Sequence, residues 1–129
     1  FWGMNKEIIN SKNAPAPIGP YSQAVKTGNL LFLSGQIPID PATGNLRMGN
    51  IEEETLQVMK NLKVVLKEAG AGFENVVKTT IFLSDMGLFS QVNEVYGKFF
   101  TSNFPARETV AVKTLPKNVN VEISMIAAL

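Results

Sequence analysis

The chain contains no cysteine and no histidine. The first absence excludes disulfides, thiolate nucleophiles and zinc-thiolate sites, and the second removes the commonest metal ligand and general base. Any catalysis must therefore use carboxylate, Arg, Lys, Tyr, hydroxyl or amide side chains, or the backbone. We expect no metal site.

A strong charge imbalance and long apolar runs are also lacking. Twelve basic residues face eleven acidic ones, for a net charge of +1, so no whole-molecule field attracts nucleic acid or an anionic membrane. The sequence shows neither a hydrophobic leader nor a run long enough to cross a bilayer. We expect a cytoplasmic protein that does not bind membranes, and nucleic acid is a disfavoured partner.

The length of 129 residues and the 45% apolar content fit one domain with one core. Phe1, Trp2 and Gly3 precede Met4, which can serve as an initiator, so we interpret the first three residues as a remnant of cloning. A single domain is expected over residues 4–129.

The clearest helical signal covers residues 51–69, where apolar residues recur at helical spacing and lysines occupy the other face. Asn50, with Glu53 three residues later, can cap its start, and Gly70 can end it. Ser84-Asp85 can cap a second helix whose apolar stripe consists of Phe89, Val92, Tyr96, Phe99 and Phe100.

Strand patterns occur at residues 29–36 and 76–83, and residues 107–114 and 119–127 alternate like a terminal hairpin. The proline-rich residues 13–23 predict a loop. This order predicts an α+β fold, a mixed sheet with two helices packed on one face. Because the central strands are apolar on both faces, we expect a symmetric homo-oligomer to cover the other face.

The hairpin predicts a cluster of chemical groups. Matching the apolar residues of its two strands puts Arg107, Thr109 and Glu122 together on the face turned away from the helices. An arginine, a hydroxyl and a carboxylate gathered there are either a structural ion pair or a site for a small anion.

Three segments together resemble the hallmark segments of the RidA family. They read Gly19-Pro20-Tyr21-Ser22-Gln23-Ala24, Ser34-Gly35-Gln36-Ile37-Pro38 and Phe104-Pro105-Ala106-Arg107. Residues 76–80, 92–96 and 115–123 are similar to the family as well, so the resemblance covers nearly everything after Met4.

The resemblance implies a chorismate-mutase-like fold assembled as a homotrimer with sites between subunits. It further implies a 2-iminobutanoate/2-iminopropanoate deaminase, which hydrolyses enamines and imines such as 2-aminoacrylate to 2-oxo acids and ammonia without a cofactor.

The family roles carry over to matching residues. Arg107 resembles the arginine that binds the substrate carboxylate, Glu122 the glutamate that orients or activates water, and Tyr21 the residue that closes the pocket. The implied substrate-binding residues are Ser34, Gly35, Phe89, Asn93, Glu108 and Thr109, with the backbone acting around Gly35 and from Glu108 to Thr109. Many RidA proteins have cysteine where this chain has Thr109, so we expect an altered substrate preference.

Two other functions stay open. Some relatives are described as translation inhibitors with endoribonuclease activity, but this sequence has no basic tract and no histidine pair for RNA cleavage. The other is a ligand-binding or chaperone-like trimer that uses the same clefts without turnover.

Overall fold

The computed structural model describes residues 5–129, so the interpretation of residues 1–3 and of Met4 lies outside the described residues. Six strands form one sheet in the order β1-β2-β3-β6-β4-β5, in which only β4 and β5 run parallel. The elements are β1 (Lys6–Ile9), β2 (Ala24–Thr27), β3 (Leu30–Gln36), α1 (Ile51–Glu68), β4 (Val76–Leu83), α2 (Phe89–Gly97), β5 (Ala106–Ala111) and β6 (Val121–Ala128).

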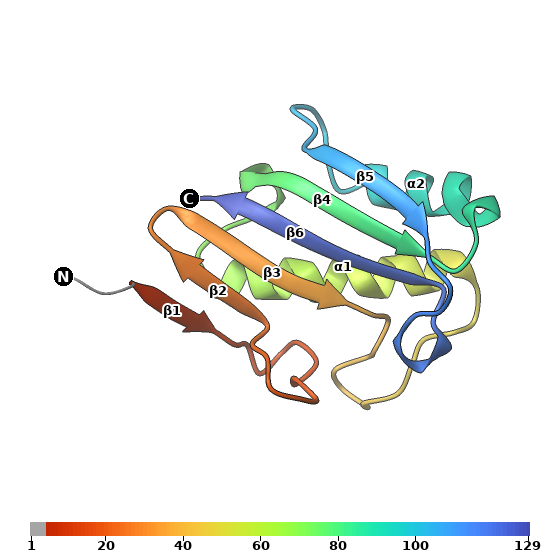
Figure 1. Ribbon diagram of the computed structural model, residues 1–129, viewed down its shortest axis with the longest axis horizontal. Helices are drawn as coiled ribbons and strands as arrows, with labels where there is room; N and C mark the ends of the chain where they lie inside the picture. The colour runs from red at the N-terminus through yellow and green to blue at the C-terminus, as the bar shows by residue number, and fades with distance from the viewer. Residues whose placement is uncertain (1–4) are drawn as a thin grey trace.

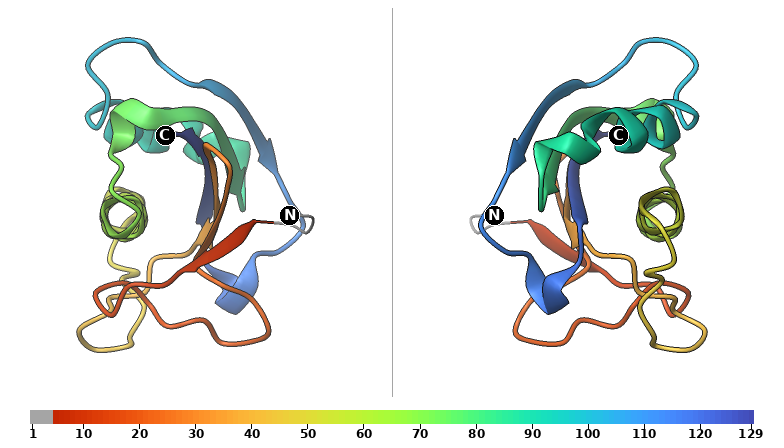
Figure 2. Two further views of the ribbon diagram at one scale, coloured as in Figure 1. Left: turned by 90° about the vertical axis from the view of Figure 1, so that its left-hand side faces the viewer. Right: turned by 90° about the vertical axis from the view of Figure 1, so that its right-hand side faces the viewer.

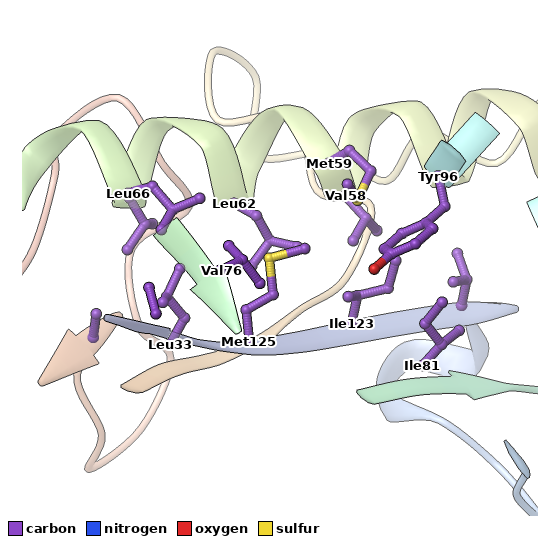
Figure 3. Packing of buried hydrophobic residues seen from close by; sticks show 14 of the residues in the cluster. Leu33, Val58, Met59, Leu62, Leu66, Val76, Ile81, Tyr96, Ile123 and Met125 are labelled. Carbon is purple, nitrogen blue, oxygen red and sulfur yellow. The ribbon is translucent and has the colours of Figure 1, made fainter. Parts of the chain in front are cut away.

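Both helices lie on one face of the sheet, which curves around α1 (Figures 1 and 2). This arrangement confirms the predicted α+β class. The core lies between the two layers, where Leu62 and Leu66 of α1 point toward Met125 and Leu33 of the sheet (Figure 3). No helix in the described part of the chain is long and apolar enough to cross a membrane.

The helix α1 has the ends that the sequence predicts. Asn50 Oδ1 accepts a hydrogen bond from the Glu53 N–H at 2.8 Å. At the other end Gly70 adopts a φ of 76°, a conformation that glycine reaches without steric cost, and donates to the Lys67 carbonyl at 2.9 Å. The predicted boundaries are confirmed to within one residue.

The helix α2 is shorter than predicted. Asp85 caps a 3₁₀ turn over Met86–Leu88, and α2 itself ends at Gly97. The prediction that Phe99 and Phe100 belong to this helix is wrong. Both residues still pack at the core, because Phe100 lies 4.9 Å from the ring of Tyr96 and Phe99 lies 5.4 Å from that of Phe73, measured between centroids.

The predicted terminal hairpin is wrong, because β4 lies between β5 and β6. The connecting segment passes the end of β4, where Val112 donates to the Leu83 carbonyl at 2.9 Å and Ser84 donates to the Asn120 carbonyl at 3.0 Å. It turns through a 3₁₀ segment, Pro116–Asn118, with two positive φ angles.

This topology separates residues that the hairpin would have joined. Arg107 pairs with Thr79, whose side chain is buried beneath the helices, and Thr109 follows two residues later on the same face. Glu122 pairs with Phe82 on the opposite face. The prediction that Arg107, Thr109 and Glu122 share one face is therefore wrong.

The sheet face opposite the helices, called the open face here, carries exposed apolar side chains. Those at least one third exposed include Ile8, Leu30, Phe32 and Val110. The sequence prediction of an apolar open face is confirmed in this chain.

The connection from β3 to α1 contains an exposed loop, residues 40–50. Its tip turns at Gly44, which has a φ of 78° and donates to the Asp40 carbonyl at 2.8 Å. An isolated bridge between Ile39 and Leu46 closes the base of the loop.

Two candidate half-sites on opposite faces

The first half-site forms around Arg107, the second residue of the edge strand β5. One terminal N–H of the guanidinium donates to Asn93 Oδ1 at 2.6 Å. The guanidinium carbon lies 5.4 Å from the ring centroid of Phe89 and 5.3 Å from that of Tyr96. The helix α2 thus supplies one polar and two aromatic contacts that orient the guanidinium.

No carboxylate within residues 5–129 forms an ion pair with Arg107, since the ion pairs there join Arg47 with Asp40 and Lys78 with Glu108. The guanidinium borders a pocket of 480 Å³. Its lining consists of Asn93, Tyr96, Gly97, Phe104, Pro105 and Arg107. A planar fork with unused N–H groups beside such a pocket suits a carboxylate.

Tyr96 packs between the guanidinium of Arg107 and the buried side chain of Thr79. Burial raises the pKa of its phenol, while the hydrogen bond with Thr79 and the charge of Arg107 lower it, with burial prevailing. The phenol therefore stays protonated at neutral pH and donates to Thr79 Oγ1 at 3.0 Å. This bond fixes the ring against which the guanidinium packs.

The second half-site forms around Glu122 of β6. A pocket of 440 Å³ brings Glu122 together with Tyr21, Ser34 and Gly35. The carboxylate of Glu122 lies over Gly35 so closely that a methyl group added to Gly35 would overlap it. Glycine is needed here for space, since its backbone φ is not in the left-handed region.

Burial raises the pKa of the Glu122 carboxyl above its ordinary value. A carboxylate with a raised pKa is a stronger proton acceptor than an exposed one, and it stands beside an open pocket. The group is therefore suited to polarise a water molecule.

Two buried polar residues of α1 anchor the two chain segments that flank the Glu122 pocket, one after β3 and one before β6. Asn61 Nδ2 donates to the carbonyls of Ile37 at 3.3 Å and Ile39 at 2.9 Å, which fixes the chain after β3. The carboxylate of Glu54 accepts from Asn120 twice, from the backbone N–H at 3.0 Å and from the side chain at 2.8 Å, just before β6 begins. Both walls of the pocket are thereby tied to one rigid helix.

The side chains of Glu108 and Thr109 line neither of the two pockets. The side chain of Glu108 forms an ion pair with Lys78 at 3.4 Å and accepts from Thr80 at 3.4 Å. The hydroxyl of Thr109 is buried without a hydrogen-bond partner within residues 5–129. Their backbone groups, to which the predicted role applied, belong to the edge strand β5.

The structure thus gathers Arg107, Phe89 and Asn93 in one half-site and Tyr21, Ser34, Gly35 and Glu122 in the other. Sequence reasoning missed Tyr96 as a site residue. Its spacing pointed to it, because Phe89, Asn93 and Tyr96 follow one another by four and three residues on a helix. A larger pocket of 720 Å³ between Lys63 and Asn103 contains none of the predicted site residues.

Comparison with known proteins finds close relatives over nearly the whole chain. A family model described as Endoribonuclease L-PSP matches residues 11–129. A human protein named 2-iminobutanoate/2-iminopropanoate deaminase is 47% identical over 122 residues, which cover 95% of this chain and 89% of the human protein.

Solved structures agree with this result. The crystal structure of a Rid family protein from Yersinia pestis shares 50% identity with a TM-score of 0.94 and covers 96% of this chain and 99% of its own. The structure of TdcF from E. coli, which contains bound serine, shares 37% identity with a TM-score of 0.91 and covers 95% and 98% of the two chains.

Proposed function

Because this chain belongs to the RidA family, which the Endoribonuclease L-PSP model describes, we propose that it is a cytoplasmic 2-iminobutanoate/2-iminopropanoate deaminase. Its substrates are enamines and imines such as 2-aminoacrylate, and its products are 2-oxo acids and ammonia. No cofactor takes part. The proposal is supported by the human relative with that name.

The orientation of Arg107 carries the proposal. The substrate is a 2-imino acid, so its carboxylate lies next to the reacting carbon. The free N–H groups of Arg107 bind that carboxylate, and Asn93 with the two aromatic rings holds the guanidinium in place. The bound serine of the E. coli relative is likewise a small amino acid with a carboxylate.

Hydrolysis then needs one water molecule and a proton acceptor. The enamine first tautomerises to the imine by moving a proton to carbon. Water adds to the C=N carbon while Glu122 accepts one of its protons and passes it to the imine nitrogen, which gives a carbinolamine. Glu122 then takes the proton of the carbinolamine hydroxyl and passes it to the nitrogen as the C–N bond breaks and the C=O bond forms. Ammonia leaves and the 2-oxo acid remains. The half-buried carboxylate of Glu122, with its raised pKa, is the acceptor.

Arg107 and Glu122 lie on opposite faces of one chain, so we propose that a complete site combines the Arg107 half of one copy with the Glu122 half of another. The apolar open face supplies a surface for this assembly. The assembly is a homotrimer, as the family resemblance implies.

A dehydratase that releases 2-aminoacrylate from serine supplies the substrate for the test, and ammonia and pyruvate are measured with and without this protein. Acceleration over spontaneous hydrolysis is expected. Equal rates with and without the protein would contradict the proposed activity and leave a binding or chaperone-like role.

Mixed oligomers test the shared site. Arg107→Ala and Glu122→Gln are each expected to be nearly inactive, but random mixing after reversible dissociation gives about one quarter of the sites two intact halves. Recovered activity near that fraction is expected. A site within one chain would give no recovery.

The endoribonuclease description of the family model makes RNA the second substrate to test. The two half-sites offer one arginine and one glutamate and no histidine, and the described chain shows no basic tract beside them. We expect intact RNA after incubation under conditions in which the imine is hydrolysed.

A further inference from the structure

Gln23 is a buried amide whose hydrogen bonds tie two distant segments together. Its side chain is 2% exposed. Its Oε1 accepts from the Ser11 N–H at 2.6 Å, and its Nε2 donates to the carbonyls of Ser11 at 3.1 Å and Pro15 at 2.9 Å. Both N–H groups and the oxygen of the amide are thus used on residues 11–15.

The backbone around Gln23 is connected just as directly to the Glu122 half-site. Its carbonyl accepts from the Ser34 N–H at 2.9 Å, and the Ser34 hydroxyl donates to the Ser22 carbonyl at 2.6 Å. Ser34 and Gly35 line the pocket that contains Glu122. Gln23 therefore connects the loop of residues 11–22 to the strand that forms the pocket.

The rest of that loop is held by burial of Ala14 in the core and by a few other hydrogen bonds, among them the one from Asn13 N–H to Ser11 Oγ at 3.1 Å. It contains three prolines and no regular secondary structure, and its own backbone bonds are Ala14 to Ser11 at 3.4 Å and Tyr21 to Gly19 at 2.9 Å. Yet it supplies a wall of the pocket through Pro15, Ala16, Ile18 and Tyr21. The amide of Gln23 makes three hydrogen bonds to the start of this loop.

We propose that Gln23 is a positioning residue for the deaminase: it holds the loop of residues 11–22 in the conformation that forms the pocket before substrate arrives. This inference rests on the proposed function. When the loop is already ordered, substrate binding does not have to offset the entropy cost of ordering it. Loss of this order should therefore weaken substrate binding more than it slows the chemical step.

Two substitutions separate the hydrogen bonds from the volume of the side chain. Gln23→Met keeps the length of the side chain and removes all three of its hydrogen bonds. Gln23→Glu keeps an acceptor for Ser11 but turns a carboxylate oxygen toward two carbonyls. Protonation of the new carboxylate restores one donor. The KM of Gln23→Glu, divided by that of the wild type at the same pH, should therefore fall toward one as the pH is lowered, whereas the same ratio for Gln23→Met should not change.

Asn75 provides a matched control, because its amide also makes two side-chain hydrogen bonds, accepting from Gly72 at 3.0 Å and donating to Ala128 at 3.1 Å. It lines neither half-site pocket. Asn75→Leu should lower the melting temperature without changing KM or kcat of the folded enzyme.

The experiment measures KM and kcat for imine hydrolysis and amide hydrogen exchange of residues 11–22 in the oligomeric protein. Gln23→Met should raise KM about tenfold with a smaller change in kcat, and the loop should exchange faster. Wild-type KM and exchange in both Gln23 variants would overturn the proposal, as would an equal rise in KM for Asn75→Leu. If the wild type hydrolyses no imine, the proposed function fails, and the exchange data still decide whether Gln23 holds the loop.

Discussion

Replacing Arg107 with lysine keeps the positive charge and removes the planar fork. Lysine binds one carboxylate oxygen as a point charge, whereas arginine can donate to both oxygens in parallel. The Arg107→Lys variant also loses the guanidinium bond to Asn93 and the packing of the guanidinium against the rings of Phe89 and Tyr96. The charge alone therefore does not restore the geometry.

The size of the effect follows from the lost bond. One hydrogen bond to a charged group contributes about 1.5 to 3 kcal/mol, which corresponds to about a tenfold to 150-fold loss in kcat/KM. Weaker orientation by Asn93 moves the expected value toward the upper end of this range.

The assay compares kcat/KM for ammonia release from 2-aminoacrylate in the wild type, Arg107→Lys and Arg47→Lys. The last variant makes the same chemical change at an arginine that pairs with Asp40 at 3.9 Å, outside both pockets, and should behave like the wild type. A value for Arg107→Lys within about twofold of the wild type would refute the carboxylate-binding role.

Four further outcomes are expected. Because burial raises the pKa of Glu122, wild-type kcat/KM should fall as the pH drops through that raised value, and a pH-rate profile of Glu122→Gln should lack this limb. The raised pKa also means that ionisation of Glu122 destabilises the folded protein. This destabilisation is absent below the ordinary pKa of a glutamate and complete above the raised pKa. Thermal melts should therefore show Glu122→Gln gaining stability relative to the wild type as the pH rises between these two values. Gly35→Ala should fold, since only the flexible Glu122 side chain needs to move, but should lose turnover in the ammonia assay; normal kinetics would show that the carboxylate position is unimportant. Phe32→Glu places a charge on the apolar open face, where Phe32 is 42% exposed, and light scattering should show a smaller oligomer than the wild type.

The sequence predicted α1 and the open face well because local signals and burial agree there. Asn50 and Gly70 mark the two ends of the helix, and the alternation of β6 reports which residues face the helices. Both signals lie within a few residues of the features that they predict.

The pairing of β5 could not be read in the same way. Alternation reports which face a residue occupies relative to its neighbours in one strand, but it does not name the strand alongside. Val112 bonds with Leu83 and not with β6. This single error moved Arg107 to the wrong face, and the separation into two half-sites followed only from the structure.

The short strands β1 and β2 were missed for a related reason. Each has four residues, too few for a clear periodicity, and each is stabilised by a neighbour far along the chain or across a tight turn. Gly28-Asn29, with a φ of 58° at the glycine, was the available signal for the turn between β2 and β3.

The loop of residues 40–50 is anchored at both ends by groups that do not involve its tip. Asn61 holds the chain before it, and Asn50 caps the helix after it, while residues 41–45 are exposed. Lengthening such a loop costs little free energy. A short peptide inserted beside Gly44 would therefore give one variant a distinct mass, and native mass spectrometry could then count the copies of each variant in every mixed oligomer.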